Sequence, residues 1–210
     1  MQINESGRSM IEMLGVLAII GVLTVGGIAG YSKAINSYRV NKTIDQVSQI
    51  ASNVRTLFSG HKTYAALGST TNAKLIGKSH LFPDELISGS GDTYTVQTNV
   101  FGGNITLVVG DKSASSDNKA FIITMTGIPQ EACIRIATED WGSGSSSGLV
   151  AMSVKGGTSA QSLAGIYVKA AGSSKVAVAG SSSHPIPMKV SEASAACSNA
   201  AKNVIAWKFY

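Results

Sequence analysis

One uncharged stretch near the start of the chain limits what the whole sequence can fold into. From Met13 to Tyr31 no residue is charged and most are apolar. This is close to the roughly 20 residues that a helix needs to cross the hydrocarbon core of a bilayer. Glu12 stands at the edge of this run, four residues after Arg8. A carboxylate at a membrane boundary is costly without a partner, so Glu12 is either a functional acid or an interfacial residue of a simple anchor.

The helical pattern continues beyond Tyr31 without a breaker. Apolar residues recur there at three- and four-residue steps, at Ile44, Val47, Ala51, Val54 and Phe58, with Ile50 and Leu57 widening the stripe. This spacing predicts an amphipathic helix to about residue 59, where Gly60 can end it. A helix over residues 9–59 would be about 75 Å long, and we expect it to yield most easily at Gly26–Gly30. A water-soluble domain does not need such a helix, so an anchored or polymerising protein is indicated.

The remaining residues read as a mixed head. Segments rich in β-branched residues predict strands over 94–97, 105–109, 120–125, 149–155, 166–168, 176–178 and 203–210. Helices are expected over 129–137 and 192–202, with helical turns at 73–76 and 83–86. Residues 105–109 and 120–125 are expected to pair as a hairpin, and Ile205, Trp207 and Phe209 to face the long helix. The predicted fold class is α+β, one long helix packed on an antiparallel sheet.

The two cysteines, Cys133 and Cys197, bear on where the head resides. An exported domain meets an oxidising compartment, where a cysteine pair tends to close. Closing so long a loop would stabilise the fold by about 4 kcal/mol. The N-terminal segment lacks the basic start and the small-residue cleavage site of an ordinary secretory signal, so the helix is expected to stay attached.

No pattern in the sequence argues for catalysis, a cofactor or a metal. His61, His80 and His184 are scattered and have no metal-ligand spacing around them. Residues 144–148 fit the Gly-x-Ser-x-Gly pattern, but they lie in a low-complexity run that indicates a loop. We therefore expect no catalytic, cofactor-binding or metal-binding residues, and we expect that the protein is not an enzyme.

The formal charge of +5 is basic but dispersed. A basic surface attracts nucleic acid or anionic lipid. No block of lysines or arginines stands out, however, and no aromatic residues interleave with them. An ordinary charge balance is therefore the better interpretation, and a role in binding nucleic acid stays open.

The stretch from Gly7 to Glu12, Gly-Arg-Ser-Met-Ile-Glu, followed by the apolar run, resembles the class III leader of type IV pilins. In that family a prepilin peptidase cuts after the glycine, the new first residue is methylated, and an acid stands at the fifth mature position. The resemblance implies a cut between Gly7 and Arg8, with Glu12 as the assembly residue. The family usually begins its mature chain with Phe, Met or Leu and carries basic residues in its leader, and this chain departs on both points.

The head resembles type IVb pilins, including bundle-forming and conjugative thin-pilus pilins. Asn99-Val100-Phe101-Gly102-Gly103 resembles their Asn-Pro-Phe-Gly-Gly turn, with valine in place of proline. Ala132-Cys133 and Ala196-Cys197 resemble the two Ala-Cys pairs whose cysteines form a disulfide in that family. The resemblance implies the same bond here, tying down the C-terminal region. The short leader is typical of type IVa pilins, so the subclass stays open.

The resemblance implies a division into a leader (residues 1–7), a transmembrane or fibre-core half-helix (8–31), an amphipathic half-helix (32–60) and a globular head (61–210). The expected function is a structural subunit of a type IV pilus, a homopolymer formed through the N-terminal helices. The subunit would await assembly in the inner membrane and then reach the cell surface. Its expected partners are the prepilin peptidase, the assembly machinery and a host or bacterial surface.

Two other functions fit parts of the same sequence. A pseudopilin of a type II secretion system shares the export signal, but acidic residues for a calcium site near the C-terminus would be expected of it and are not seen. A single-pass anchored protein that never polymerises is the other. The choice among adhesion, aggregation, motility and conjugation, and between major and minor subunit, stays open.

Overall fold

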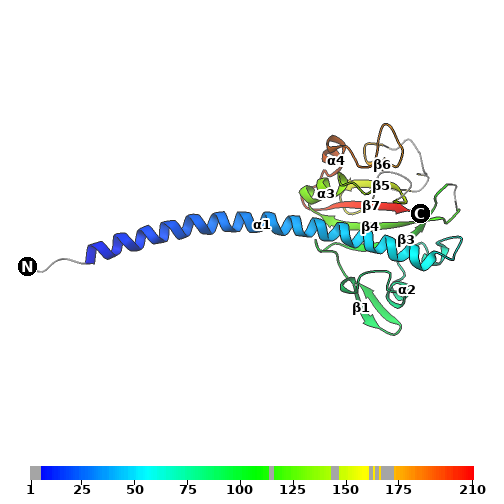
Figure 1. Ribbon diagram of the computed structural model, residues 1–210, viewed down its shortest axis with the longest axis horizontal. Coiled ribbons are helices and arrows are strands. Elements are labelled where there is room, and N and C mark those ends of the chain that lie inside the picture. Colours follow the sequence, from blue (N-terminus) through cyan, green and yellow to red (C-terminus); the bar gives the residue numbers. More distant parts are fainter. Residues whose placement is uncertain (1–5, 114–115, 143–146, 161–162, 164–165, 167–172) are drawn as a thin grey trace, which may run out of the picture. The chain divides into compact units, whose positions relative to one another are not determined.

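The computed structural model describes residues 6–113, 116–142, 147–160, 163, 166 and 173–210. The chain divides into two compact units, Met1–Tyr38 and Arg39–Tyr210. Helix α1, Ser6–Phe58, is continuous through both (Figure 1). The predicted long helix is confirmed, and it runs unbroken through the glycines at 26–30.

A five-stranded antiparallel sheet forms the centre of the second unit. Its order is β3-β4-β7-β5-β6, which places the last strand of the chain in the middle (Figure 1). The strands are β3 Ile105–Gly110, β4 Ala120–Ile128, β5 Leu149–Gly156, β6 Val176–Val178 and β7 Asn203–Phe209. Strands β3 and β4 form the expected hairpin, with Ile105 opposite Met125 and Gly110 opposite Ala120.

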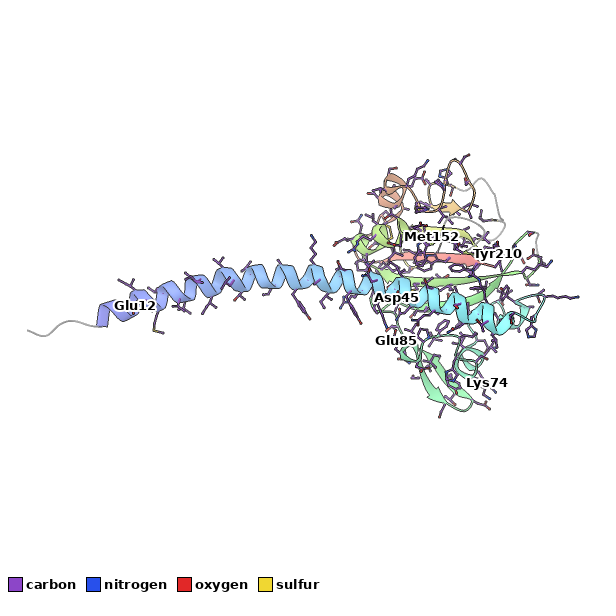
Figure 2. The ribbon with its side chains drawn as sticks, in the orientation of Figure 1. Glu12, Asp45, Lys74, Glu85, Met152 and Tyr210 are labelled. Carbon is purple, nitrogen blue, oxygen red and sulfur yellow. A yellow bond between two sulfur atoms is a disulfide. The ribbon has the colours of Figure 1, made fainter. Side chains whose placement is uncertain are left out.

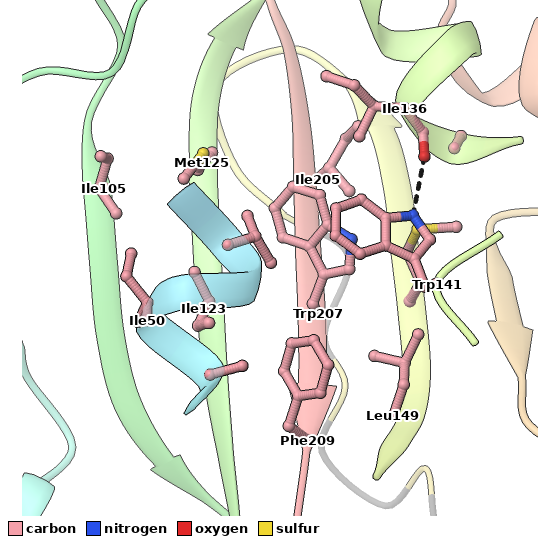
Figure 3. Packing of buried hydrophobic residues seen from close by; sticks show 14 of the residues in the cluster. Ile50, Ile105, Ile123, Met125, Ile136, Trp141, Leu149, Ile205, Trp207 and Phe209 are labelled. Atoms are coloured by element: carbon pink, nitrogen blue, oxygen red, sulfur yellow. Dashed lines mark hydrogen bonds between the residues drawn. The ribbon is translucent and has the colours of Figure 1, made fainter. Parts of the chain in front are cut away.

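The main hydrophobic core lies between this sheet and the second half of α1. Val47, Ile50 and Val54 are fully buried there and belong to the predicted apolar stripe of the helix. Leu57, which the spacing predicts to widen the stripe, is 41% exposed, so the prediction is wrong at that position. Trp207 and Phe209 lie in the same core (Figure 3). The prediction that alternate residues of the last strand face the helix is therefore confirmed, because a strand sends every second side chain to one face.

The opposite face of the sheet carries a second, smaller core. Its buried members are Val150, Ala151, Leu163, Val176, Val178 and Ala206. Lys208 belongs to this face of β7 and is only 1% exposed. Its Nζ donates to the carbonyl oxygens of Leu163 (3.1 Å) and Ile166 (2.9 Å), which replace the water that the ammonium loses. Burial lowers the pKa of Lys208, and the nearby Asp111 and Asp117 oppose that shift.

A two-stranded sheet, β1 Ile87–Ser90 and β2 Thr93–Val96, stands apart from the main sheet. Only the second strand matches a prediction, because the Ile-Ser-Gly-Ser sequence of β1 has little strand propensity of its own. Helix α2, Ala73–Lys78, packs on β2. Gly77 makes this close approach feasible, since a side chain there would lie 2.2 Å from the ring of Tyr94. Short 3-10 turns occupy Ala65–Leu67 and Asp84–Leu86.

Of the two helices predicted at the margin of the sheet, one has the predicted extent and the other is shorter than predicted. Helix α3, Gln130–Ala137, is where Pro129 predicts its start. Helix α4 covers only Val190–Ala196, so the prediction of a helix over 192–202 is wrong beyond Ala196. The side-chain oxygen of Asn199 accepts hydrogen bonds from the backbone of Ala201 and Lys202. Such local bonds compete with the helical ladder and turn the chain into β7.

Two sequence predictions concern residues outside the described ranges. The expected strand at 166–168 is described only at Ile166, and the loop expected over 144–148 is described only at its last two residues.

Candidate functional site: an exposed apolar helix and a stapled head

The first unit presents its apolar side chains outward. The following large hydrophobic residues are between 52% and 74% exposed: Met10, Ile11, Met13, Leu14, Val16, Leu17, Ile19, Ile20, Val22, Leu23, Val25, Ile28 and Tyr31. They surround the helix instead of forming one stripe, as expected of a segment whose environment is apolar on all sides. Within Met10–Phe58 the helix is long and apolar enough, by length and composition, to cross a membrane.

Glu12 lies two residues, just over half a helical turn, beyond Met10, where the described part of this exposed surface begins (Figure 2). Together with Met13, Val16 and Leu17 it lines a shallow hollow of about 260 Å³. Gly7 and Arg8 are part of the first turns of α1. The sequence-predicted processing bond and the predicted assembly acid are thus less than two helical turns apart along one helix.

The glycines of the first unit leave gaps in its surface. A Cβ built on Gly15, Gly21, Gly26, Gly27 or Gly30 has no other atom within 4 Å. In an apolar environment such positions let two helix backbones approach closely, which strengthens their packing.

The two cysteines of the head are joined by a disulfide. Cys133 on α3 and Cys197 at the end of α4 are fully buried, with their Cα atoms 6.0 Å apart and 64 residues apart in sequence. The side chain of Gln130 reinforces the junction by donating from Nε2 to the carbonyl oxygen of Cys197 (2.9 Å). Asn203, the first residue of the central strand β7, adds a further hydrogen bond. Its Nδ2 donates to the carbonyl oxygen of Ile128 (2.9 Å) at the end of β4. The C-terminal region is therefore fastened to the middle of the sheet.

The five-residue turn at 99–103 has a structural reason for each of its distinctive residues. Asn99 is buried, and its Oδ1 accepts hydrogen bonds from the backbone of Phe101 (2.9 Å) and Gly103 (3.1 Å). Its Nδ2 donates to the carbonyl oxygen of Thr126 (2.9 Å). Gly102 has a φ of 80°, which favours glycine, and Gly103 lies directly against the backbone of β4. The turn is thereby locked onto the strand where its register with β7 shifts.

Substitution of Gly103 by alanine is expected to lower the free energy of unfolding by about 2 to 3 kcal/mol, because its Cβ would lie 1.8 Å from the carbonyl oxygen of Thr126. Urea denaturation of the full chain in detergent measures the loss. Gly60→Ala is the matched control, since nothing lies within 4 Å of a Cβ at that position. Equal midpoints for the two variants would contradict this account of the turn.

An ion pair fastens the second half of α1 to the segment before β1. Glu85 accepts hydrogen bonds from Lys42 Nζ (2.8 Å) and from Gln46 Nε2 (2.7 Å). These two bonds hold the pKa of the Glu85 carboxyl below its usual value. Sequence periodicity places Lys42 correctly on the polar side of the helix, but it contains no signal for this partner, which is distant in sequence.

The stabilisation from Glu85 is expected to disappear in acid. Because the pKa of Glu85 is depressed in the folded state, its contribution is present above the pKa of the unfolded chain and is lost as pH falls through the folded value. The side chain is 44% exposed, so the effect is at most about 1 kcal/mol. Urea midpoints of wild type and Glu85→Gln should differ at pH 7 and converge by pH 3. Asp84→Asn, whose side chain is 91% exposed, should show no such convergence; the same profile in both variants would contradict the assignment.

Arg55 is a further link that sequence reasoning did not single out. From α1 its Nε donates to the main-chain oxygen of Tyr210 (2.9 Å), and its guanidinium lies 5.3 Å from the ring centre of Phe209. A second bond runs from Nη2 to the carbonyl oxygen of Ser147. Burial lowers the pKa of Arg55, although the group remains a cation. The helix thus holds the end of β7 by an ionic group as well as by apolar packing.

The three histidines lie in different parts of the head. The ring of His61 lies at a tilt to that of Phe58, with the ring centres 5.6 Å apart. His80 lies 3.3 Å from Asp84, and His184 lies 3.1 Å from Glu192. Among the residues that the structure describes, no group of three or more His, Cys, Asp or Glu side chains is placed to hold a metal ion.

Pilus subunits are found among the relatives of this chain. The major structural subunit of the bundle-forming pilus of Escherichia coli is 29% identical over 140 residues, which are 66% of this chain and 66% of that protein. The toxin coregulated pilin of Vibrio cholerae is 24% identical over 135 residues, 64% of this chain and 58% of that protein. The matches thus span 66% of the length of the first relative and 58% of the second, less than two thirds of either.

Solved structures show the same fold. The type IV b pilin from Salmonella typhi is 18% identical, with a TM-score of 0.50 over 78% of this chain and 95% of the other. TcpA, a type IV pilin from Vibrio cholerae El Tor biotype, is 17% identical, with a TM-score of 0.57 over 82% of this chain and 99% of the other.

A long apolar helix that continues into an α+β head, together with these relatives, identifies the protein as a type IV pilin. The bundle-forming relative is a major structural subunit of its pilus. The family described as PilS N terminal matches residues 37–208, well over half of the sequence, and the chain belongs to that family.

Proposed function

We propose that this protein is the precursor of a type IV pilus subunit, cut after Gly7 and polymerised through residues 8–31. The observation that carries the proposal is the exposed apolar surface that surrounds the helix between Met10 and Tyr31. Monomeric soluble proteins rarely expose so large an apolar patch. Lipid surrounds it before assembly, and the helices of neighbouring subunits surround it afterwards.

Glu12 is the residue on which this exchange of environments depends. Once buried among apolar neighbours, an unpaired carboxylate would cost several kcal/mol. The N-terminal ammonium of an adjacent subunit, carried by Arg8 after cleavage, neutralises it. The pairing sets the axial register of each incoming subunit, because only one displacement brings the two charges together.

This proposal assigns a separate role to each of four segments of the chain. Residues 1–7 are the leader recognised by a prepilin peptidase, 8–31 the membrane and fibre-core segment, 32–60 the half-helix packed on the head, and 61–210 the head itself. The names of the relatives support a surface fibre, and the apolar helix supports an inner-membrane stage. The partners are further copies of this chain, the peptidase, the assembly machinery and a host or bacterial surface. Loss of Glu5 with the leader raises the formal charge from +5 to +6, which is the one feature that favours binding of nucleic acid.

Electron microscopy of cells with and without the gene tests the proposal. Long surface fibres that depend on the gene are expected. Mass spectrometry of the sheared fibres should give a methylated N-terminus at Arg8. Short periplasmic stubs would instead indicate a pseudopilin, and the absence of any filament would indicate an anchored protein that does not polymerise.

A further inference from the structure

The residues just beyond the apolar run differ in kind from those within it. Tyr31 is 68% exposed, Tyr38 is 62% exposed, and Lys33 between them is also exposed. All three belong to the first unit. The sequence contains no acidic residue between Glu12 and Asp45, so the nearest acids along the helix are more than three turns from Lys33.

The directions of these side chains indicate how the helix meets a membrane surface. At 100° per residue, Tyr31 and Tyr38 share one face of the helix, and Lys33 points to the opposite side. A helix that lies flat on a membrane gathers its polar residues on a single face. A distribution around the whole circumference instead indicates a helix that passes through the surface.

The depth of Lys33 follows from the length of the apolar run. Met13–Tyr31 spans about 28 Å at 1.5 Å per residue, close to the thickness of the hydrocarbon core. With this segment in the core, the tyrosines lie at the interface that aromatic residues favour. The Lys33 ammonium then reaches the level of the lipid phosphates. The ion pairs found among the described residues all lie in the second unit, so none of them engages Lys33.

We propose that Lys33, which lies between Tyr31 and Tyr38 in sequence and on the opposite face of the helix, binds the headgroup phosphate of anionic phospholipids in the membrane where the subunit awaits assembly. The inference rests on the membrane stage of the proposed function. Charge complementarity selects the occupant, because a cation without nearby acids attracts an anionic headgroup more strongly than a zwitterionic one. The contact fixes how deep the stored helix sits, and it must be released when the subunit leaves the membrane.

Fluorescence quenching by brominated lipids tests this site in the full chain reconstituted into vesicles. Tyr31→Trp places an aromatic reporter at the interface. Trp141 and Trp207 of the head are 8% and 0% exposed, so they add a constant background that lipid does not reach. Brominated phosphatidylglycerol should quench the reporter at an about fivefold lower mole fraction than brominated phosphatidylcholine, the effect of one lysine at an anionic surface.

The matched variants are Lys33→Gln and Lys62→Gln in the Tyr31→Trp background. The first should remove the fivefold preference, and the second, which loses an exposed lysine of the head, should retain it. Equal quenching by the two lipids in the parent, or a preference that survives Lys33→Gln, overturns the lipid site. Surface fibres are examined separately with the unaltered chain: normal fibres with equal quenching reject the lipid site alone, and selective quenching without fibres rejects polymerisation alone.

Discussion

Removal of the Cys133–Cys197 disulfide is expected to lower the free energy of unfolding by about 4 kcal/mol. The bond closes a loop of 64 residues, so its loss returns a large conformational entropy to the unfolded chain. The double variant Cys133→Ala with Cys197→Ala leaves no free thiol to form other bonds. Urea denaturation of the full chain in detergent measures the difference, which is a large part of the 5–15 kcal/mol that typically stabilises a domain.

Reduction of the wild-type protein provides the control for this prediction. If the bond itself is responsible, the reduced wild type and the double variant should unfold at nearly the same urea concentration, apart from the small change in packing. In hydrogen exchange, the backbone amides of α4, which the bond joins to α3, should lose their protection first. The amides of the α1 residues that pack on the sheet should lose theirs later. A double variant within 1 kcal/mol of the oxidised wild type would contradict the prediction.

Elements with strong periodicity were the ones that the sequence could predict. The stripe of α1 that includes Val47, Ile50 and Val54 follows from helical spacing, and the inward side of β7 follows from alternation. Both signals exist because one face of the element is buried over several turns or residue pairs. The long helix and the α+β class follow from these two elements alone.

Features that depend on a distant partner could not be predicted from local pattern. Lys208 lies between two residues of β7 that face the core, so its side chain would be expected to face solvent. The segment that contains Leu163 and Ile166 covers it instead. Arg55 and Glu85 gain their roles from residues 155 and 39 positions away. The early end of α4 depends on side-chain bonds of Asn199, which helix propensity does not include. The candidate assembly site is different, because its residues are adjacent in sequence and are visible there before any fold is known.

Substitution of Glu12 by alanine is expected to reduce the yield of surface fibres at least about 100-fold. In the proposed fibre core the change would leave the N-terminal ammonium and Arg8 without a counter-charge, and breaking a buried ion pair costs about 3 to 5 kcal/mol. Each 1.4 kcal/mol corresponds to a factor of ten in an equilibrium constant. Quantitative immunoblotting of sheared fibres against the membrane fraction measures the ratio, and the variant should accumulate in the membrane at the wild-type level.

Two matched variants test whether fibre assembly requires a carboxylate at position 12 or only the same number of acidic residues in the chain. Glu12→Asp keeps the carboxylate on a shorter side chain and should retain part of the fibre yield. Glu139→Ala removes an exposed acid of the head and should leave the yield unchanged. A Glu12→Ala strain with fibres at the wild-type level would show that Glu12 has no part in assembly.

Arg8 allows the two contributions of Glu12 to be separated. If Glu12→Ala fails only because cations are left unpaired, then adding Arg8→Phe, the kind of residue usual at this position, should restore most of the yield. If Glu12 also sets the axial register through the ammonium, the double variant should recover about tenfold at most, since the ammonium still lacks its partner. We expect the smaller recovery, because a register contact requires one charge at a defined place and Arg8 supplies only additional charge nearby. Full recovery would limit the role of Glu12 to neutralising Arg8.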